Sequence, residues 1–341
     1  MDRLIKSPPM PSSSKPPKPT PQEARLAELE IRNRFAEQGI GGPAHGAGRL
    51  SARERIAHLL DEGTFVEMGK LVTHRAVEFG MQEMRVPGDG CITGYGKVQG
   101  RVAFVFAQDA SVFGGTLSEA NAAKIVATMD RAISVGAPII GLYDSHGIRI
   151  EDGVSALAGM QQVLLSGAKA RGVVPQLAVL LGPATEGTLL AASIADFIVT
   201  RKNVTESVSN VAHLLAADDE ACLRAVRELL SFLPSSYRDV SPMSAYVGQD
   251  ANVPEIEDEP YDMAEVIAKI VDTDSLLQVQ EHHARNLIVG FARMEGRAVG
   301  IVANQPLCLE GALDGDAAAK GARFVRLCNA FNIPILTFED A

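Results

Sequence analysis

The chain has 341 residues, of which 46% are hydrophobic and 22% charged, and its formal net charge is −10. This length predicts two subdomains, and the negative charge argues against a general nucleic-acid binder. No apolar run approaches the ~20 residues of a membrane helix, and no charged-then-apolar leader indicates secretion. The four cysteines form no CxxC pair, so neither a zinc ribbon nor a redox dithiol, and no metal site, is expected. Scattered thiols are typical of a reduced compartment, which predicts a cytoplasmic protein, or one of the mitochondrial matrix if it is eukaryotic.

The N-terminal part is predicted to be a tail followed by two helices. Residues 1–21 are rich in Pro, Ser and Lys and predict a disordered tail. Apolar residues at helical spacing begin near Gln22 and end at Gly39. A second helix begins after Ser51, because Glu54 three residues later completes a capping box.

Three arginines, Arg49, Arg53 and Arg55, surround this cap in an otherwise acidic protein. One interpretation is a solvated face on which they pair with Glu54 and Asp61. The other is a contact for a phosphorylated ligand or for a partner subunit. The sequence leaves both open.

From about Val86 the pattern changes to short strands, glycine turns and longer helices. In chain order we expect strands over 91–96 and 98–107, a helix capped by Thr116 or Ser118 that runs to about Val135, a buried strand over 139–143 and a helix over about 154–170. This alternation is typical of an α/β fold.

The stretch 173–197 is the one to which we assign chemistry. Its apolar run 177–181 predicts a buried strand, which breaks at Gly182, and a helix of small residues follows over about 188–195. A strand that feeds a helix through a glycine-containing turn leaves the first N–H groups of the helix unpaired. Such groups can hold a phosphate, a carboxylate or a developing oxyanion, although an ordinary strand-to-helix turn has the same pattern.

A second copy of the central pattern follows at an offset of 196 residues. In this frame Gly100-Arg101 falls on Gly296-Arg297, and Lys124 falls on Lys320. The predicted units are a tail over 1–21, an N-terminal domain over 22–233, a linker over 234–260 and an incomplete C-terminal domain over 261–341.

Several long motifs in the right order resemble acyl-CoA carboxyltransferase subunits, most of all the β subunit of propionyl-CoA carboxylase. They are GRLSARERIAHLLDEGTFVE, VPGDG, VFAQDASVFGGTLSEANAAKI, VGAPIIGLYDS and NLIVGFARMEGRAVGIVANQP. The resemblance covers nearly everything from about residue 46 onward. It implies a crotonase-like (ClpP/crotonase) superhelix of stacked ββα units, with one nearly complete N-terminal domain and the start of a second.

The same resemblance implies transfer of a carboxyl group from carboxybiotin to the α-carbon of a short, propionyl-CoA-like acyl-CoA. No cofactor is expected to be bound covalently, because a partner α subunit with biotin carboxylase and biotin carrier parts would supply the carboxybiotin. A homo-oligomer is expected, with no nucleic-acid or membrane partner. The catalytic residues implied are Gly147, Glu186 and Gly187. The residues implied in ligand binding are Gly114, Gly115, Ser145, Arg149 and Gly182.

The chain departs from the family pattern in four places. Residues 145–149 read Ser-His-Gly-Ile-Arg where the family has Ser-Gly-Gly-Ala-Arg, and residues 184–188 read Ala-Thr-Glu-Gly-Thr where it has Cys-Ala-Gly-Gly-Ala. A family segment between Phe197 and Val211 is missing, and the second domain stops after its first repeat. His146 is either a contact for a carboxylate or an exposed loop residue.

Three hypotheses follow. The chain is the acyl-CoA half of a biotin-dependent carboxyltransferase that is incomplete or inactive alone, or a degenerate, non-catalytic subunit of a carboxylase complex. In the third hypothesis it is a stand-alone crotonase-type acyl-CoA enzyme in which Glu186 acts as a general acid or base.

Overall fold

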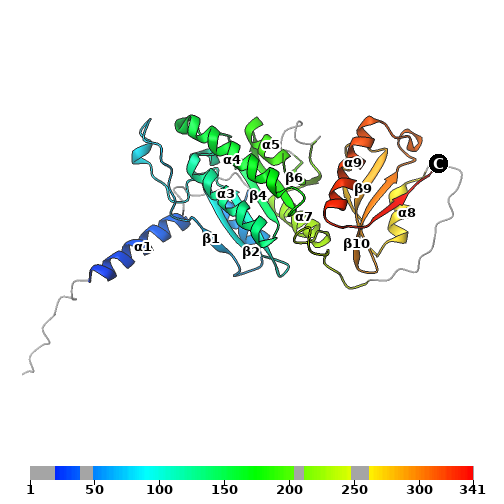
Figure 1. Ribbon diagram of the computed structural model, residues 1–341, viewed down its shortest axis with the longest axis horizontal. Coiled ribbons are helices and arrows are strands. Elements are labelled where there is room, and N and C mark those ends of the chain that lie inside the picture. The colour runs from blue at the N-terminus through cyan, green and yellow to red at the C-terminus, as the bar shows by residue number, and fades with distance from the viewer. Residues whose placement is uncertain (1–19, 39–48, 203–210, 247–260, 341) are drawn as a thin grey trace, which may run out of the picture.

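The computed structural model describes residues 20–38, 49–202, 211–246 and 261–340. Almost all of the predicted tail, and residues 247–260 of the predicted linker, lie outside these ranges. The first described helix, α1 (Pro21–Gln38), matches the predicted one and projects from the body of the protein (Figure 1). Among the described helices, none is both long and apolar enough to cross a membrane.

The larger of two sheets has seven strands in the order β1-β2-β3-β4-β5-β6-β7. The first two pairs of neighbours are antiparallel, and the others are parallel. The strands are β1 (Val66–Met68), β2 (Cys91–Val98), β3 (Arg101–Gln108), β4 (Ile139–Ser145), β5 (Gln176–Ala184), β6 (Phe197–Arg201) and β7 (Leu214–Ala216). This is the α/β arrangement that the sequence predicts.

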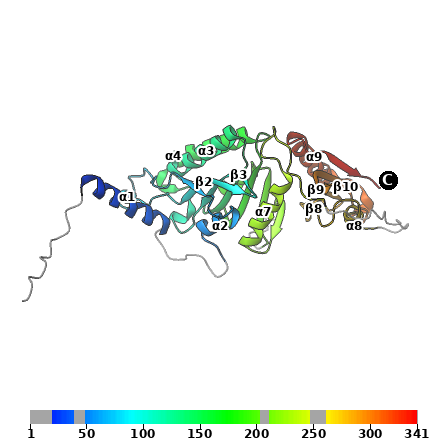
Figure 2. The same cartoon turned by 90° about the horizontal axis from the view of Figure 1, so that it is seen from below.

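Helices cover both faces of this sheet (Figure 2). On one face lie α3 (Glu119–Val135), α4 (Val154–Ala170) and α5 (Glu186–Ser193), and on the other lie α2 (Ala52–Leu59) and α7 (Asp219–Phe232). Each face has its own aliphatic core, one with Ile125 and Met129 of α3, the other with Leu59 and Val226. Short 3-10 helices connect some elements: η1 (Met81–Glu83), η2 (Phe113–Gly115) and η3 (Ile150–Asp152).

A smaller sheet of the C-terminal part has the order β11-β10-β9-β8. Its elements are α8 (Met263–Ile270), β8 (Leu277–Val279), β9 (Leu287–Met294), β10 (Arg297–Asn304), η4 (Leu309–Gly311), α9 (Gly315–Ala330) and β11 (Ile335–Phe338). Phe291 of β9 stacks on Phe232 of α7, with ring centroids 5.8 Å apart. The smaller sheet therefore shares the core that α2 and α7 form with the larger one.

The predicted internal repeat is confirmed down to single hydrogen bonds. Strands β9 and β10 have the bounds of β2 and β3 shifted by 196 residues. The buried Lys124 donates from Nζ to the carbonyl oxygens of Gly88 and Cys91. Lys320 donates to the corresponding carbonyls of Ala284 and Leu287. The lysine in the shared Ala-Ala-Lys sequence therefore holds the same turn in both copies.

The repeat also extends upstream, which the sequence comparison missed. Asp61, after α2, accepts hydrogen bonds from the hairpin amides of Gln99 and Gly100. Asp272, after α8, accepts them from the hairpin amides of Glu295 and Gly296. An alignment without gaps cannot find this match, because residues 69–90 connect β1 to β2 whereas the shorter segment 280–286 connects β8 to β9.

A buried histidine at the seam between the two sheets gives a pH prediction. His213 Nδ1 accepts a hydrogen bond from the N–H of Ile198 (3.0 Å), and burial lowers the pKa of His213 to about 3. An unfolded histidine has a pKa of ~6.5, so the stability that the neutral ring contributes is complete above that pH and is lost as the pH falls toward 3. Between about pH 7.5 and 5 the loss amounts to about 2 kcal/mol.

The variant His213→Asn keeps an acceptor near Nδ1 but cannot take up a proton. We therefore expect the difference in unfolding free energy between wild type and variant, measured by urea unfolding, to shift by that amount over this pH range. His58→Asn, at an exposed position of α2, is the control and should show no such shift. A difference that does not change with pH would contradict the prediction.

Candidate functional site

Two loops meet at the carboxyl ends of β4 and β5, which is where ligands bind in open α/β sheets. The first loop follows β4 and contains Gly147, and the second leads from β5 into α5. A Cβ placed on Gly147 would lie 2.8 Å from Thr185 Oγ1, the N-cap residue of α5. The two stretches in which the sequence places the chemistry therefore touch each other.

The start of α5 differs from the prediction. Strand β5 continues through Gly182 to Ala184, and α5 begins at Glu186 rather than near Thr188. The strand runs on because Ala184 still pairs with Ser145, after an irregular register in β4. Thr185 has extended backbone angles and makes no side-chain capping hydrogen bond. The amides of Gly187 and Thr188 lie in the first helical turn and so have no intrahelical acceptor.

The predicted donor at Gly147 needs a correction. Its N–H already donates to Ser145 Oγ at 3.0 Å, so it is not free for a ligand. The next amide along the chain, that of Ile148, donates to no described residue. A Cβ on Gly187 would lie 3.8 Å from Ile148 Cγ1, so Ile148 and Gly187 are neighbours across the site. Ile148, which the sequence did not indicate, therefore replaces Gly147 as the candidate partner of Gly187.

The other predicted glycines lie where backbones approach closely. A Cβ on Gly115 would lie 2.1 Å from the carbonyl oxygen of Asp144, and one on Gly182 would lie 1.7 Å from Asp144 Oδ1. Gly114 accepts a hydrogen bond at its carbonyl from the N–H of His146 (3.0 Å). These three glycines surround the end of β4 and shape the loop there. Their role in ligand binding stays a prediction.

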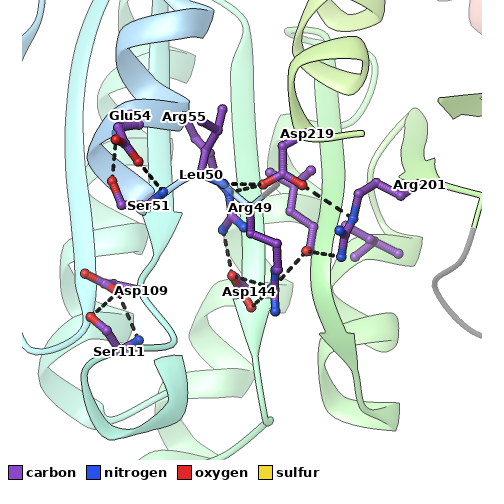
Figure 3. Close-up of polar contacts among 12 residues, drawn as sticks. Arg49, Leu50, Ser51, Glu54, Arg55, Asp109, Ser111, Asp144, Arg201 and Asp219 are labelled. Atoms are coloured by element: carbon purple, nitrogen blue, oxygen red, sulfur yellow. Dashed lines mark hydrogen bonds and ion pairs between the residues drawn. The ribbon is translucent and has the colours of Figure 1, made fainter. Parts of the chain in front are cut away.

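Asp144, the residue before Ser145, is the centre of a buried ionic network (Figure 3). Arg55 Nη1 lies 2.7 Å from Asp144 Oδ2, and Arg49 Nη2 lies within 3.1 Å of both carboxylate oxygens. Arg55 Nε also binds Asp219 at 2.9 Å, and Arg201 Nε lies 3.4 Å from that carboxylate, an ion pair without hydrogen-bond geometry. Asp144, Asp219 and Arg55 are each at most 1% exposed in their side chains.

The structure contradicts the first interpretation of the arginine cluster, a solvated face paired with Glu54 and Asp61. Arg49 and Arg55 pair with Asp144, and Arg53 pairs with Glu67. The second interpretation, a contact for a phosphorylated ligand or a partner subunit, stays a prediction. Arg49 and Arg201 each donate to the carbonyl oxygen of Leu181, at the end of β5 (3.1 and 2.9 Å). Arg49 therefore joins Asp144 of β4 to Leu181 of β5, the two strands from which the loops of the site lead.

Arg149, for which the sequence implied ligand binding, is held inside the protein. Its side chain is 1% exposed and forms an ion pair with Asp89. The guanidinium also donates to Oγ1 and the carbonyl oxygen of Thr116 (3.2 and 3.1 Å) and lies over the ring of Phe113. In this structure the Arg149 side chain anchors the loop after β4 to Asp89 and Thr116 inside the protein.

The sequence singles out two further residues of these loops, His146 and Glu186, and the structure shows where each lies in the chain fold. His146 is exposed in the loop after β4, as one of its two interpretations expects. Glu186 opens α5 beside Gly187, but its side chain lies outside the described part of the protein. The hypothesis that Glu186 acts as a general acid or base stays open.

A small cavity of about 20 Å³ lies beneath the two loops. Ser145, Gly147 and Thr188 line it on the loop side, and the remaining walls are mostly apolar. The exceptions are Gln108, which ends β3, and Tyr143 of β4, whose side chain carries a hydroxyl. The site thus combines unpaired main-chain amides with an enclosed, largely apolar space.

Comparison with known proteins gives consistent matches. The carboxyl transferase domain family matches residues 43–209 and 203–341. The propionyl-CoA carboxylase beta chain of Cereibacter sphaeroides is 42% identical, over 92% of this chain and 70% of that protein. The methylmalonyl-CoA decarboxylase subunit alpha of Veillonella parvula is 40% identical, over 87% and 65%. A transcarboxylase 12S structure, titled as a hexamer with methylmalonyl-coenzyme A and methylmalonic acid bound, superposes with a TM-score of 0.88 at 34% identity, over 94% of this chain and 70% of that one.

Proposed function

Because the chain belongs to the carboxyl transferase family and is of the propionyl-CoA carboxylase type, we propose that it holds the acyl-CoA side of carboxyl transfer. In this proposal a short acyl-CoA binds with its thioester oxygen at the amides of Ile148 and Gly187. The carboxyl group passes between carboxybiotin, supplied by a biotin-bearing partner subunit, and the α-carbon of the acyl group. The protein acts as a homo-oligomer together with that partner.

The apposition of Ile148 and Gly187 is the observation that carries the proposal. Removal of an α-proton from a thioester, or loss of carbon dioxide from an α-carboxylated one, gives an enolate with negative charge on the thioester oxygen. Fixed N–H dipoles at that oxygen lower the energy of this intermediate, and the reaction needs no side-chain nucleophile. The ionic network around Asp144 keeps both loops in place, so the amides do not have to reorganise as charge develops.

The residues present fit the acyl-CoA side of the reaction. The described part of the N-terminal unit provides the pair of loops after β4 and β5 that would hold the acyl thioester. Carboxybiotin would supply the carboxyl group when it is bound.

One observation favours a non-catalytic subunit as a second candidate. The side chains of Ile148 and Met160 adjoin Gly187, with Met160 Cε 3.5 Å from the position of a Cβ there. The family pattern has alanine where this chain has Ile148. A larger side chain at this position narrows the space beside the amides, which would weaken acyl-CoA binding.

Calorimetric titration with propionyl-CoA separates the two candidates. We expect the wild-type chain to bind propionyl-CoA more tightly than CoA alone, and Gly187→Val to lose this difference because its side chain fills the space beside Ile148. If Ile148 obstructs the site, Ile148→Ala should tighten binding by about tenfold, equivalent to ~1.4 kcal/mol. Ile150→Ala, at a position that is 87% exposed, is the matched control. The proposed site would be contradicted if the wild type bound propionyl-CoA no more tightly than CoA, or if Gly187→Val kept the wild-type preference for propionyl-CoA.

A further inference from the structure

The cavity beneath the two loops contains an unpaired polar atom that the proposed reaction does not use. Gln108 is 5% exposed, and its side chain lines the cavity together with Ser145 and Thr188. Its Oε1 atom is buried and receives no hydrogen bond from any described residue. Native proteins rarely leave a buried amide oxygen without a donor, so a group from outside the chain is expected to provide one.

The internal repeat shows that the fold does not require this arrangement. Asn304 ends β10 as Gln108 ends β3, and it occupies the corresponding position of the second copy. Its Nδ2 donates to the carbonyl oxygen of Asp340 at 2.7 Å, and its Oδ1 accepts from the N–H of Asp340 at 2.9 Å. A side-chain amide at this position can thus be satisfied by the backbone that follows the neighbouring strand, and Gln108 departs from that pattern.

The size and the walls of the cavity limit what can occupy it. A volume of about 20 Å³ holds one water molecule or a group of similar size. Most of the other lining side chains are apolar and include Leu117, Met160 and Val163, and Tyr143 also lines the cavity. The space begins at Gly147 and Thr188, next to the amides at which a thioester oxygen would bind.

We infer that this cavity lies at the end of the acyl group and that Gln108 is a specificity-determining residue that sets the limit of the acyl length. This inference rests on the proposed function. A short acyl group ends at the mouth of the cavity, beside Gly147 and Thr188, so the one water molecule that the cavity holds still donates to Gln108 Oε1. A longer acyl group displaces that water and places an apolar group against an unpaired amide oxygen, which is unfavourable. The site therefore selects short acyl chains.

The test is to compare how tightly propionyl-CoA, hexanoyl-CoA and CoA bind to the wild type and to Gln108→Met, by calorimetry. Methionine has nearly the same length and no amide oxygen. We expect the preference of the wild type for propionyl-CoA over hexanoyl-CoA to fall by about tenfold in Gln108→Met, within the ~5- to 150-fold range for leaving a buried polar group unpaired. Gln161→Met, at an exposed position of α4, is the matched control and should keep the wild-type preference.

The melting temperature checks that the variant is folded. Gln108→Met should melt no lower than the wild type, because it removes an unpaired polar group from an apolar wall. If Gln108→Met melts lower than the wild type because methionine packs poorly, Gln108→Leu, with a smaller side chain, replaces it in the binding test. An unchanged chain-length preference in these variants overturns the inference and leaves the proposed function in place. Failure of the wild type to bind propionyl-CoA more tightly than CoA overturns both.

Discussion

Asp144→Asn is expected to lower the free energy of unfolding by about 3–5 kcal/mol, because it removes one of two carboxylates from a buried network and leaves Asp219 alone to neutralise Arg49, Arg55 and Arg201. Asp144 neutralises Arg55, whose side chain is 1% exposed, and also Arg49. The variant keeps the size of the side chain, so Gly182, which packs against this carboxylate, meets no new steric conflict. The expected loss is therefore electrostatic.

Urea unfolding of the wild type and Asp144→Asn measures this effect. Glu220→Gln is the control, since Glu220 forms an exposed i,i+4 pair with Arg224 and such pairs contribute about 0.3–0.5 kcal/mol. Propionyl-CoA binding should weaken in Asp144→Asn as well, because the same network joins β4 to Leu181 of β5, and both loops of the site lead from these strands. A variant as stable as the wild type would show that the network is not what holds the loops.

Local sequence was enough to predict most of the elements. Ser118 forms the predicted N-cap of α3, with a capping box in which Asn121 is the third residue, and Ser51 does the same for α2 with Glu54. The repeat could be predicted because Lys124 and Lys320 lie at a constant spacing from their strands. These features depend on residues a few positions apart, so the physical cause is visible in the sequence.

The site depends on contacts that sequence patterns do not contain. Arg55 and Asp144 are far apart in the chain, and only the packing of α2 against the end of β4 brings them together. The choice between Gly147 and Ile148 as donor depends on where Ser145 Oγ points, and backbone spacing does not determine a rotamer. A serine two residues before the expected donor was a signal that its hydroxyl could bind that amide.

The start of α5 shows a limit of a different kind. Gly182 and Pro183 indicated the end of a strand, but tertiary pairing with β4 carries β5 past them. Proline is compatible with a strand where its nitrogen needs no partner. The connection between β5 and α5 is therefore shorter than predicted, and the helix begins at Glu186. Gly187 lies in its first turn, where the amide has no intrahelical acceptor.

Arg149→Met is expected to destabilise the protein by about 3–5 kcal/mol while leaving propionyl-CoA affinity of the folded protein unchanged. The substitution leaves the carboxylate of Asp89, which is fully buried, without its cation. Thr116, at the other side of the guanidinium, loses hydrogen bonds at both its hydroxyl and its carbonyl. None of these contacts involves the amides of Ile148 or Gly187.

Unfolding by urea and titration with propionyl-CoA, both well below the melting temperature of the variant, distinguish a supporting role from a binding role. Arg75→Met is the matched control, because Arg75 pairs with Glu119 at the surface and its side chain is 78% exposed. A ligand-binding Arg149 would give the opposite result, with near-normal stability and a loss of affinity. Since the family motif places an arginine at the end of this loop, the outcome decides whether that arginine serves the loop's structure or contacts the substrate directly.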